Sequence, residues 1–198
     1  MKIAILGGSF DPPHKGHVAI ANRLLKLLNF DQVWLMPCYQ HPFNKNLSAP
    51  NIRFEMTKFL ENALVKVSDL EIKKKTISYS IDALNYLKKT YPHDKFSWII
   101  GTDQVGSFTK WKKWQEIIDN FQLIIVPRTE YEKAEKQLQN IKTKVSHPEN
   151  IFLIDRKNFP PIYISSRLIR QEIKESKSIS NMVPKNVEKY IIQGKLYR

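Results

Sequence analysis

Short apolar runs alternate with helix-period segments along nearly the whole of this chain of 198 residues. The first run, residues 2–6, is followed by apolar side chains that recur every three or four positions between residues 18 and 28. Further apolar runs lie at residues 32–37, 67–72, 96–101, 121–127, 151–154 and 162–164. Repeated strand–helix units predict a mostly parallel sheet with helices on both faces, and right-handed crossovers favour a doubly wound α/β topology.

The chain is long enough for one substantial core and shows no sign of a second domain. No internal repeat, low-complexity segment or linker interrupts it, so we expect a single domain over residues 1–198. The end of the chain is expected to be helical. Ser180 or Asn181 would cap a helix that has Pro184 in its first turn and Gly194 as its stop.

Three features of the sequence bear on its compartment. No apolar run approaches the ~20 residues that a membrane-spanning helix needs. The first seven residues lack the length and the small-residue cleavage site of a signal peptide. The single cysteine, Cys38, cannot form an internal disulfide and suits a reducing environment. We therefore expect a cytoplasmic protein with no membrane partner.

The formal net charge is +13, from 32 Lys and Arg against 19 Asp and Glu. Such a charge attracts polyanions, which include nucleic acids and nucleotides. The lysines are spread along the chain rather than gathered in one basic segment, and this favours a lysine-rich solvated surface. A basic nucleic-acid-binding domain is the remote alternative, and we expect no nucleic-acid partner.

Residues 7–17, with the sequence GGSFDPPHKGH, connect the first apolar run to the first helix. In an open parallel sheet, ligands bind beyond the carboxyl ends of the strands. Gly7 and Gly8 allow the backbone to approach a ligand closely and to adopt torsions closed to other residues. His14 and His17 stand three apart and so share one face at a helix start, where free N–H groups favour an anion. The pattern predicts a turn that binds phosphate.

Two other interpretations of this turn are weaker. The segment matches neither the Walker A loop nor the dinucleotide-binding G-x-G-x-x-G pattern. A zinc site built on His14 and His17 would need further ligands, and the remaining histidines and Cys38 show no supporting spacing. We expect no metal site made by the protein itself.

Gly8-Ser9-Phe10-Asp11-Pro12, followed by His14-x-Gly16-His17, resembles the signature of the nucleotidyltransferase superfamily with the [TH]-x-G-H motif. Histidine rather than threonine at position 14 is similar to the nicotinate-nucleotide adenylyltransferases. The resemblance implies a Rossmann-like nucleotidyltransferase fold. It also implies that five of these residues bind ATP: Gly8, Ser9, Phe10, His14 and His17.

Two later segments resemble parts of the same family that bind the acceptor. Lys45 and Arg53 fit its lysine and arginine after the second strand, although exposed basic residues often bind nothing. Residues 78–84, SYSIDAL, resemble its S-Y-[ST]-x-x-[TA]-L segment, which implies acceptor binding by Ser80 and Asp82. The same segment also suits a helix start capped by Ser78 or Ser80.

The strand at residues 96–101 leads into a third such segment. Gly101 and Asp103 resemble the family's G-x-D, which is associated with the nucleotide pocket. Trp111 resembles the tryptophan on which the nicotinate ring stacks, whereas we expect Trp114 to belong to the core. Lys112, also assigned to the acceptor, stands where the family often has tyrosine.

Residues 164–170, ISSRLIR, open a helix that follows a weak strand. Ser165 or Ser166 can cap this helix, and Arg170 lies about one turn further on, so hydroxyls, amides and a guanidinium can surround one anion. The segment resembles the family's I-S-S-T-x-I-R motif, which contacts ATP, with Arg167 in place of threonine.

These features predict adenylyl transfer from ATP to nicotinate mononucleotide by direct in-line attack, without a covalent intermediate. His14, His17, Lys45 and Arg170 are the expected catalytic phosphate ligands, and Mg²⁺ is expected to accompany ATP. The expected partners are small molecules, ATP and a pyridine mononucleotide, and a homo-oligomer is left open. The alternatives are adenylyltransferases that act on nicotinamide mononucleotide or on phosphopantetheine.

Overall fold

A computed structural model describes all 198 residues, and its centre is a six-stranded sheet in which every strand pair is parallel. The strands are β1 (Lys2–Gly8), β2 (Gln32–Pro37), β3 (Val65–Val67), β4 (Lys95–Gly101), β5 (Gln122–Val126) and β6 (Ile151–Leu153). Their order in space is β3-β2-β1-β4-β5-β6. The chain therefore winds outward from β1 in one direction and then, from β4, in the other, which confirms the predicted doubly wound α/β fold.

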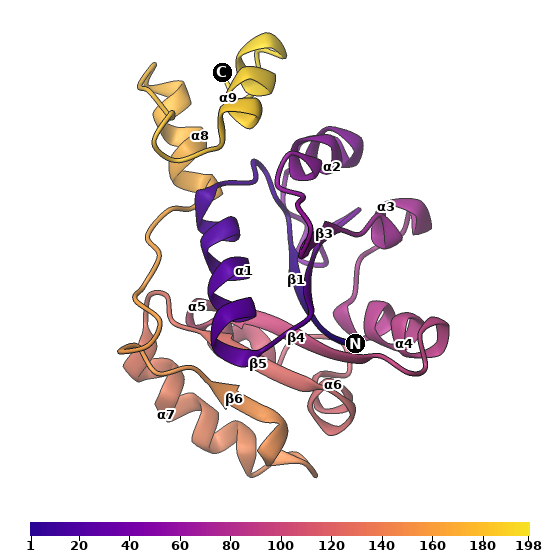
Figure 1. Cartoon of the computed structure of the whole chain (residues 1–198). Helices are drawn as coiled ribbons and strands as arrows, with labels where there is room; N and C mark the ends of the chain where they lie inside the picture. The colour runs from indigo at the N-terminus through magenta and orange to yellow at the C-terminus, as the bar shows by residue number, and fades with distance from the viewer.

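Helices cover both faces of the sheet, as Figure 1 shows. They are α1 (Lys15–Leu28), α2 (Pro50–Lys58), α3 (Leu70–Lys74), α4 (Ser80–Thr90), α5 (Thr102–Phe108), α6 (Trp114–Asn120), α7 (Tyr131–Lys142), α8 (Ser166–Lys174) and α9 (Lys185–Gln193), with one turn of 3₁₀ helix at Pro148–Asn150. No helix combines the length and the apolar composition that crossing a membrane would require.

The pleat of β1 divides the core into two halves. Ile3 and Ile5 face the cluster to which α4, α5, α6 and α7 contribute, whereas Ala4 and Leu6 face the cluster formed with α1, α2, α8 and α9. Because successive side chains of a strand point to opposite faces, a central strand buried on both sides must be apolar throughout. This requirement explains the unbroken apolar run at the start of the sequence.

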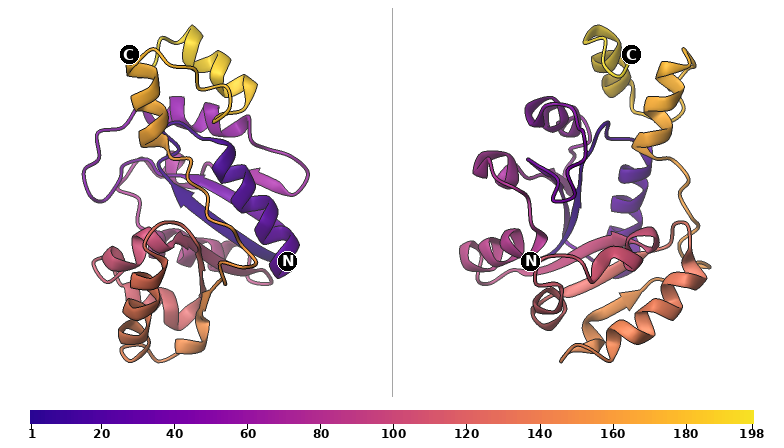
Figure 2. Two further views of the ribbon diagram at one scale, coloured as in Figure 1. Left: turned by 90° about the vertical axis from the view of Figure 1, so that its left-hand side faces the viewer. Right: turned by 180° about the vertical axis from the view of Figure 1, so that it is seen from behind.

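The last part of the chain returns to the carboxyl end of β1. The segment between β6 and α8 runs alongside α1, as the two views of Figure 2 show. It is held there by a hydrogen bond from Arg23 Nη1 to the carbonyl of Pro160 and by the Arg23 guanidinium, which lies 5.1 Å from the Phe159 ring centroid. Helices α8 and α9 are thereby placed beside the connection from β1 to α1 (Figure 1).

Three local predictions were wrong. The apolar run at residues 67–72 is not a strand, because β3 ends at Val67 and the alternation of Leu70 and Ile72 belongs to α3. Residues 162–164 form no strand, and Ile162 and Ile164 pack against the core cluster that includes α1. The last helix has Pro184 rather than Ser180 or Asn181 as its N-cap, although Gly194 ends it as expected.

Candidate active site

The connection from β1 to α1 lies at the carboxyl end of the sheet, beside the point between β1 and β4 where the winding reverses. Its glycines serve close packing rather than unusual torsions. No glycine of the chain has a positive φ, so that part of the prediction was wrong. A Cβ on Gly7 would lie 2.4 Å from Cζ2 of Trp98 on β4, and a Cβ on Gly16 would lie 2.8 Å from Nδ1 of His14. The left-handed torsion falls instead on Phe10, with φ of 49°.

His14 and His17 form a stacked pair at the start of α1. Their ring centroids are 3.8 Å apart with an interplanar angle of 25°, so the predicted shared face is confirmed. The backbone N–H of His14 donates to Nδ1 of His17 over 3.1 Å. Because Nδ1 of His17 accepts this hydrogen, the neutral ring carries its own hydrogen on Nε2, where it can be donated to a ligand.

Both histidines are held neutral by their surroundings. Burial, followed by the nearby Arg128 charge, lowers the pKa of His14 from 6.5 to about 3. Burial also lowers the pKa of His17 well below 6.5, with further contributions from His14 and Arg128. Nδ1 of His14 is buried and has no hydrogen-bond partner. A buried polar atom without a partner is unusual in a folded protein.

Arg53 occupies the interior behind the turn, which differs from its predicted role at the acceptor. It is the largest fully buried side chain, and its guanidinium donates to the carbonyls of Ser48 (2.8 Å), Ser9 (2.8 Å) and Tyr39 (2.9 Å). It also donates to Sγ of Cys38 over 3.7 Å. Four of its five N–H hydrogens are committed to these acceptors, so in this structure Arg53 holds the turn in place, and its role at the acceptor stays a prediction.

Asp11 lies at the centre of the turn and is 2% exposed. Its carboxylate accepts a hydrogen bond from the backbone N–H of Ser48 at 3.1 Å and another from the Tyr197 hydroxyl at 2.6 Å. Burial, followed by the hydrogen bond to Asp11, raises the pKa of Tyr197 far above its ordinary value. Residues at both ends of the chain thus meet at one carboxylate.

The start of α8 reaches the same turn from the opposite direction. Ser165 accepts a hydrogen bond from the Leu168 N–H at 3.2 Å, so it is the cap that the sequence predicted. The Ser166 hydroxyl donates to the Pro12 carbonyl at 2.8 Å, and Nη1 of Arg170 donates to the Asp11 carbonyl at 2.5 Å. Arg170 therefore lies beside the turn, as expected, and only Nη1 of its guanidinium takes part in this hydrogen bond.

Two further residues assigned to ligands, Phe10 and Lys45, differ in their exposure. The side chain of Phe10 is 1% exposed and belongs to the hydrophobic core, with its ring centroid 4.6 Å from that of His17, so only its backbone is available to ATP. Lys45 is exposed in the long loop after β2. Its charge contributes, after burial, to lowering the pKa of His41 in the same loop to about 4.

Asp103 follows β4 and pairs with an arginine that sequence reasoning missed. Nη1 of Arg128 lies 3.8 Å from Oδ2 of Asp103. Both side chains pack against Gly101, where an added Cβ would lie 2.6 Å from Cδ of Arg128 and 2.2 Å from Oδ1 of Asp103. Arg128 follows β5, and its backbone N–H donates to the Thr102 hydroxyl at 2.9 Å. The carboxyl-end rule that selected the other segments would also have indicated Arg128, but no motif marks it.

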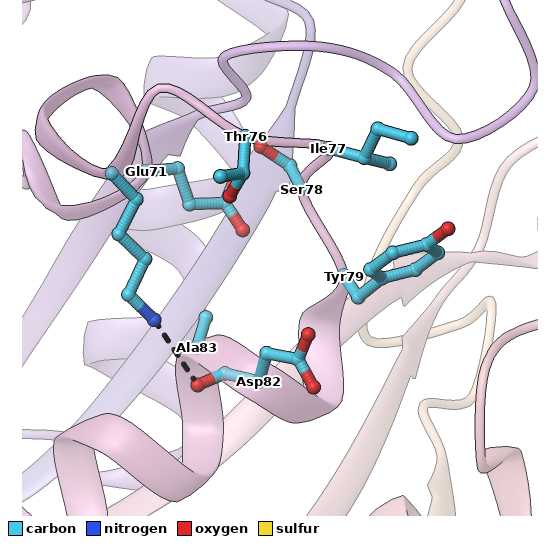
Figure 3. A pocket seen from close by; sticks show the side chains of 8 residues that line it. Glu71, Thr76, Ile77, Ser78, Tyr79, Asp82 and Ala83 are labelled. Carbon is cyan, nitrogen blue, oxygen red and sulfur yellow. Dashed lines mark hydrogen bonds between the residues drawn. The ribbon is translucent and has the colours of Figure 1, made fainter.

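The start of α4 borders a cavity of about 100 Å³ that is lined in part by Glu71, Ser78, Tyr79 and Asp82 (Figure 3). This volume is small beside the ~300–1,000 Å³ of typical ligand pockets, so it can take only part of a ligand. The prediction that Ser78 or Ser80 caps α4 was wrong, because the N-cap position is Tyr79 and the Ser78 hydroxyl accepts the Tyr39 N–H at 2.9 Å instead. Burial raises the pKa of Glu71 to about 7.

The loop between α5 and α6 faces the first turn of α4. Nζ of Lys112 lies 2.9 Å from Oδ2 of Asp82 and 4.6 Å from the ring centroid of Tyr79. Trp111 and Trp114 are partly buried against the core, with ring centroids 5.2 and 6.2 Å from that of Phe108. Trp114 thus packs as the core residue that was expected.

Residues 5–172 match the sequence model of the cytidylyltransferase-like family, so the chain belongs to this family. It is 37% identical over 202 residues to the probable nicotinate-nucleotide adenylyltransferase of Caldicellulosiruptor saccharolyticus, with 100% of both chains covered. It is 32% identical over 200 residues to the nicotinate-nucleotide adenylyltransferase of Bacillus subtilis, with 99% of this chain and 98% of that protein covered. Within the family, the chain therefore belongs to the nicotinate-nucleotide adenylyltransferases.

The fold also matches that of a solved structure. The structure of the Plasmodium falciparum nicotinic acid mononucleotide adenylyltransferase complexed with NaAD matches this chain with a TM-score of 0.79 at 21% identity, covering 99% of this chain and 97% of that one. The agreement extends from β1 through α9, and it confirms the predicted Rossmann-like nucleotidyltransferase architecture.

Proposed function

We propose that this protein transfers the adenylyl group of ATP to nicotinate mononucleotide, giving nicotinate adenine dinucleotide and pyrophosphate, a step of NAD biosynthesis. The observation that carries the proposal is the stacked pair of His14 and His17, held neutral at the start of α1 and at the carboxyl end of β1. The names of the full-length relatives support the same reaction.

This reaction requires that the acceptor phosphate be positioned in line with ATP and that the negative charge of the phosphates be neutralised. A phosphate oxygen of the acceptor attacks the α-phosphorus of ATP in line, and the bond from that phosphorus to the oxygen bridging to the β-phosphate breaks as pyrophosphate leaves. Because a phosphate dianion is already nucleophilic, no general base is required, and catalysis comes from fixed donors around the transferring group.

The donors are arranged around one turn. Nε2–H of His17 is free to donate to the triphosphate, because Nδ1 accepts the His14 N–H. Arg170 and Arg128 supply positive charge from two sides of the turn. Lys45, in the exposed loop after β2, is proposed to contact the phosphate of ATP or of the acceptor. The backbone of Gly8, Ser9 and Phe10 lines the approach to the α1 N-terminus.

The Mg²⁺ that accompanies ATP would be held mainly by triphosphate oxygens and water. No group of three or more His, Cys, Asp or Glu side chains in the chain is arranged to hold a metal ion. Mg²⁺ often keeps several waters and binds through substrate phosphates, so the donor set at this site fits an ion that enters with the nucleotide. When bound, the ion would supply positive charge that neutralises the pyrophosphate as it leaves.

The acceptor would lie between the start of α4 and the loop that carries Trp111. Ser80 and the free N–H groups of the first turn of α4 suit the carboxylate of a nicotinate ring, and the partly exposed indole of Trp111 offers it a flat face. We propose a cytoplasmic setting for the reaction, in keeping with a single buried cysteine, Cys38.

The reaction is tested by measuring pyrophosphate release from ATP and Mg²⁺ in the presence of nicotinate mononucleotide, nicotinamide mononucleotide or phosphopantetheine. The proposal expects turnover with nicotinate mononucleotide to exceed turnover with the other two. A preference for either of the others would replace the proposed acceptor.

The role of His17 is tested separately by His17→Ala. By analogy with other preorganised donors, this change should cost on the order of 3 kcal/mol of transition-state stabilisation, about a hundredfold in kcat/KM. His93→Ala is the matched control, because His93 is exposed near the start of β4, at the opposite edge of the sheet. Unchanged turnover of a folded His17→Ala protein would remove His17 from the mechanism.

A further inference from the structure

Lys112 and Asp82 join the two segments between which the acceptor ring is proposed to bind. Nζ of Lys112 donates to both carboxylate oxygens of Asp82, at 2.9 and 3.1 Å, and lies over the ring of Tyr79. Lys112 comes from the loop between α5 and α6, and Asp82 comes from the first turn of α4, thirty positions earlier. The contact therefore bridges the acceptor site.

The ion pair of Lys112 and Asp82 adds too little to the stability of the fold for stability to be its role. The side chains of Lys112 and Asp82 are 43% and 46% exposed, and ion pairs at such exposure contribute little to the free energy of unfolding. Figure 3 shows the Asp82 carboxylate on the same side of the cavity as the Tyr79 ring and away from Glu71. The pair is thus exposed to whatever approaches the start of α4.

The electrostatics of that helix start give the pair a function. Free N–H groups in the first turn of a helix favour an anion, and α4 has eleven residues. Asp82 is the acidic residue of this turn, so its negative charge offsets the positive end of the helix dipole and repels an incoming carboxylate. Lys112 cancels that charge without occupying the N–H groups themselves.

We propose that Lys112 is a specificity-determining residue, which neutralises Asp82 and so lets the start of α4 accept a pyridine ring that carries a carboxylate. This inference rests on the proposed function and adds to it the source of the preference for nicotinate over nicotinamide mononucleotide. Both mononucleotides carry the same pyridinium charge, so the comparison between them isolates the ring substituent. A carboxamide substituent is neutral and almost indifferent to the net charge at this position, whereas a carboxylate substituent is repelled when Asp82 stands alone.

The test compares Lys112→Gln, the double variant Asp82→Asn with Lys112→Gln, and the control Lys110→Gln, whose lysine is exposed on the same loop. For each protein, kcat/KM and the dissociation constant are measured with both mononucleotides. Lys112→Gln should lower the ratio of kcat/KM for nicotinate mononucleotide to kcat/KM for nicotinamide mononucleotide about five- to tenfold, and the ratio of the two affinities should fall with it. The double variant should recover the wild-type ratio, because neither charge remains, and Lys110→Gln should retain it.

Three results would overturn the inference. An equal loss for both mononucleotides in Lys112→Gln would mean that the pair only holds the loop in place. A double variant as impaired toward the nicotinate form as Lys112→Gln would mean that Lys112 contacts the ring carboxylate directly. An unchanged ratio in Lys112→Gln would remove the residue from selectivity. If the wild-type protein adenylylated neither mononucleotide, the proposed function itself would fail, and the binding constants would still report the selectivity.

Discussion

His14 makes the folded protein sensitive to acid in a way that can be calculated. The unfolded chain takes up a proton on this ring near its ordinary pKa of 6.5, whereas the buried ring in the folded protein stays neutral until about pH 3. Between these pH values, acid therefore favours the unfolded chain. Stability should be fully present above pH 6.5 and should fall as the pH falls below it.

The size of this effect follows from linkage. Each pH unit below the unfolded pKa costs about 1.4 kcal/mol while the folded ring refuses the proton, so His14 alone should remove about 2 kcal/mol at pH 5. His14 is 4% exposed, and solvent screening therefore reduces this value little. Burial lowers the pKa of His17 as well, so its loss of stability in acid adds to that of His14.

Urea unfolding at pH 7.5 and pH 5 measures the difference directly. The wild-type protein should lose about 2 kcal/mol more between the two pH values than His14→Gln, whose side chain does not titrate. Because each protein is compared with itself, any direct cost of the substitution cancels. His93→Gln, which changes an exposed histidine, is the matched control variant.

Equal pH dependence in wild type and His14→Gln would refute the reasoning. The ring can also be followed without a substitution, since proton NMR of the histidine Cε1–H signals reports each pKa in the folded protein. A His14 signal that titrates near pH 6.5 would show that the ring is solvated, and the argument for a neutral pair would fail with it.

Two further substitutions test what holds the turn in place. Arg53→Leu should lower the free energy of unfolding in urea by about 3–5 kcal/mol, because it leaves buried carbonyls without donors. The control Lys58→Leu, on the exposed side of the same helix, should change this free energy by less than about 0.5 kcal/mol. A small effect at Arg53 would mean that water replaces its hydrogen bonds. Gly7→Ala should lower the free energy of unfolding by about 1–3 kcal/mol, because its Cβ would lie 2.4 Å from the ring of Trp98. In the control Gly106→Ala, the new Cβ meets only the end of a flexible side chain. Equal melting temperatures for the two alanine variants would contradict the packing argument.

The sequence was sufficient to predict the architecture and the general location of the site. A doubly wound sheet follows from alternating apolar periods, and its carboxyl edge then selects the segments around His17 and Asp103 by one geometric rule. The segment around Ser165 reaches the same edge without the strand that was expected to precede it. The prediction was weakest where a pattern is short. Leu70 and Ile72 alternate as strand residues do, yet three residues of β3 already complete the sheet edge, and the chain turns into α3.

The supports of the turn could not be predicted, for physical reasons. Arg53 was assigned to the acceptor by resemblance alone, and because a buried arginine is rare, nothing in the sequence indicated its hydrogen bonds to three main-chain carbonyls. The hydrogen bond from Tyr197 to Asp11 spans 186 positions, and no local pattern encodes such a pairing. Arg128 carries no motif, although it follows a strand at the predicted edge.

These supports also explain why the histidine pair can remain neutral and fixed. The main chain of the turn is held by Arg53 from the α2 side, by Ser166 and Arg170 from α8, and through Asp11 by Tyr197 from the end of the chain. Donors that are fixed before the substrate arrives need no reorganisation when charge develops on the phosphates, which is the source of their catalytic effect. Because the holding groups come from residues as far apart as 11 and 197, the turn reaches its final geometry only when the last helices have packed. Formation of the site is thus coupled to completion of the fold.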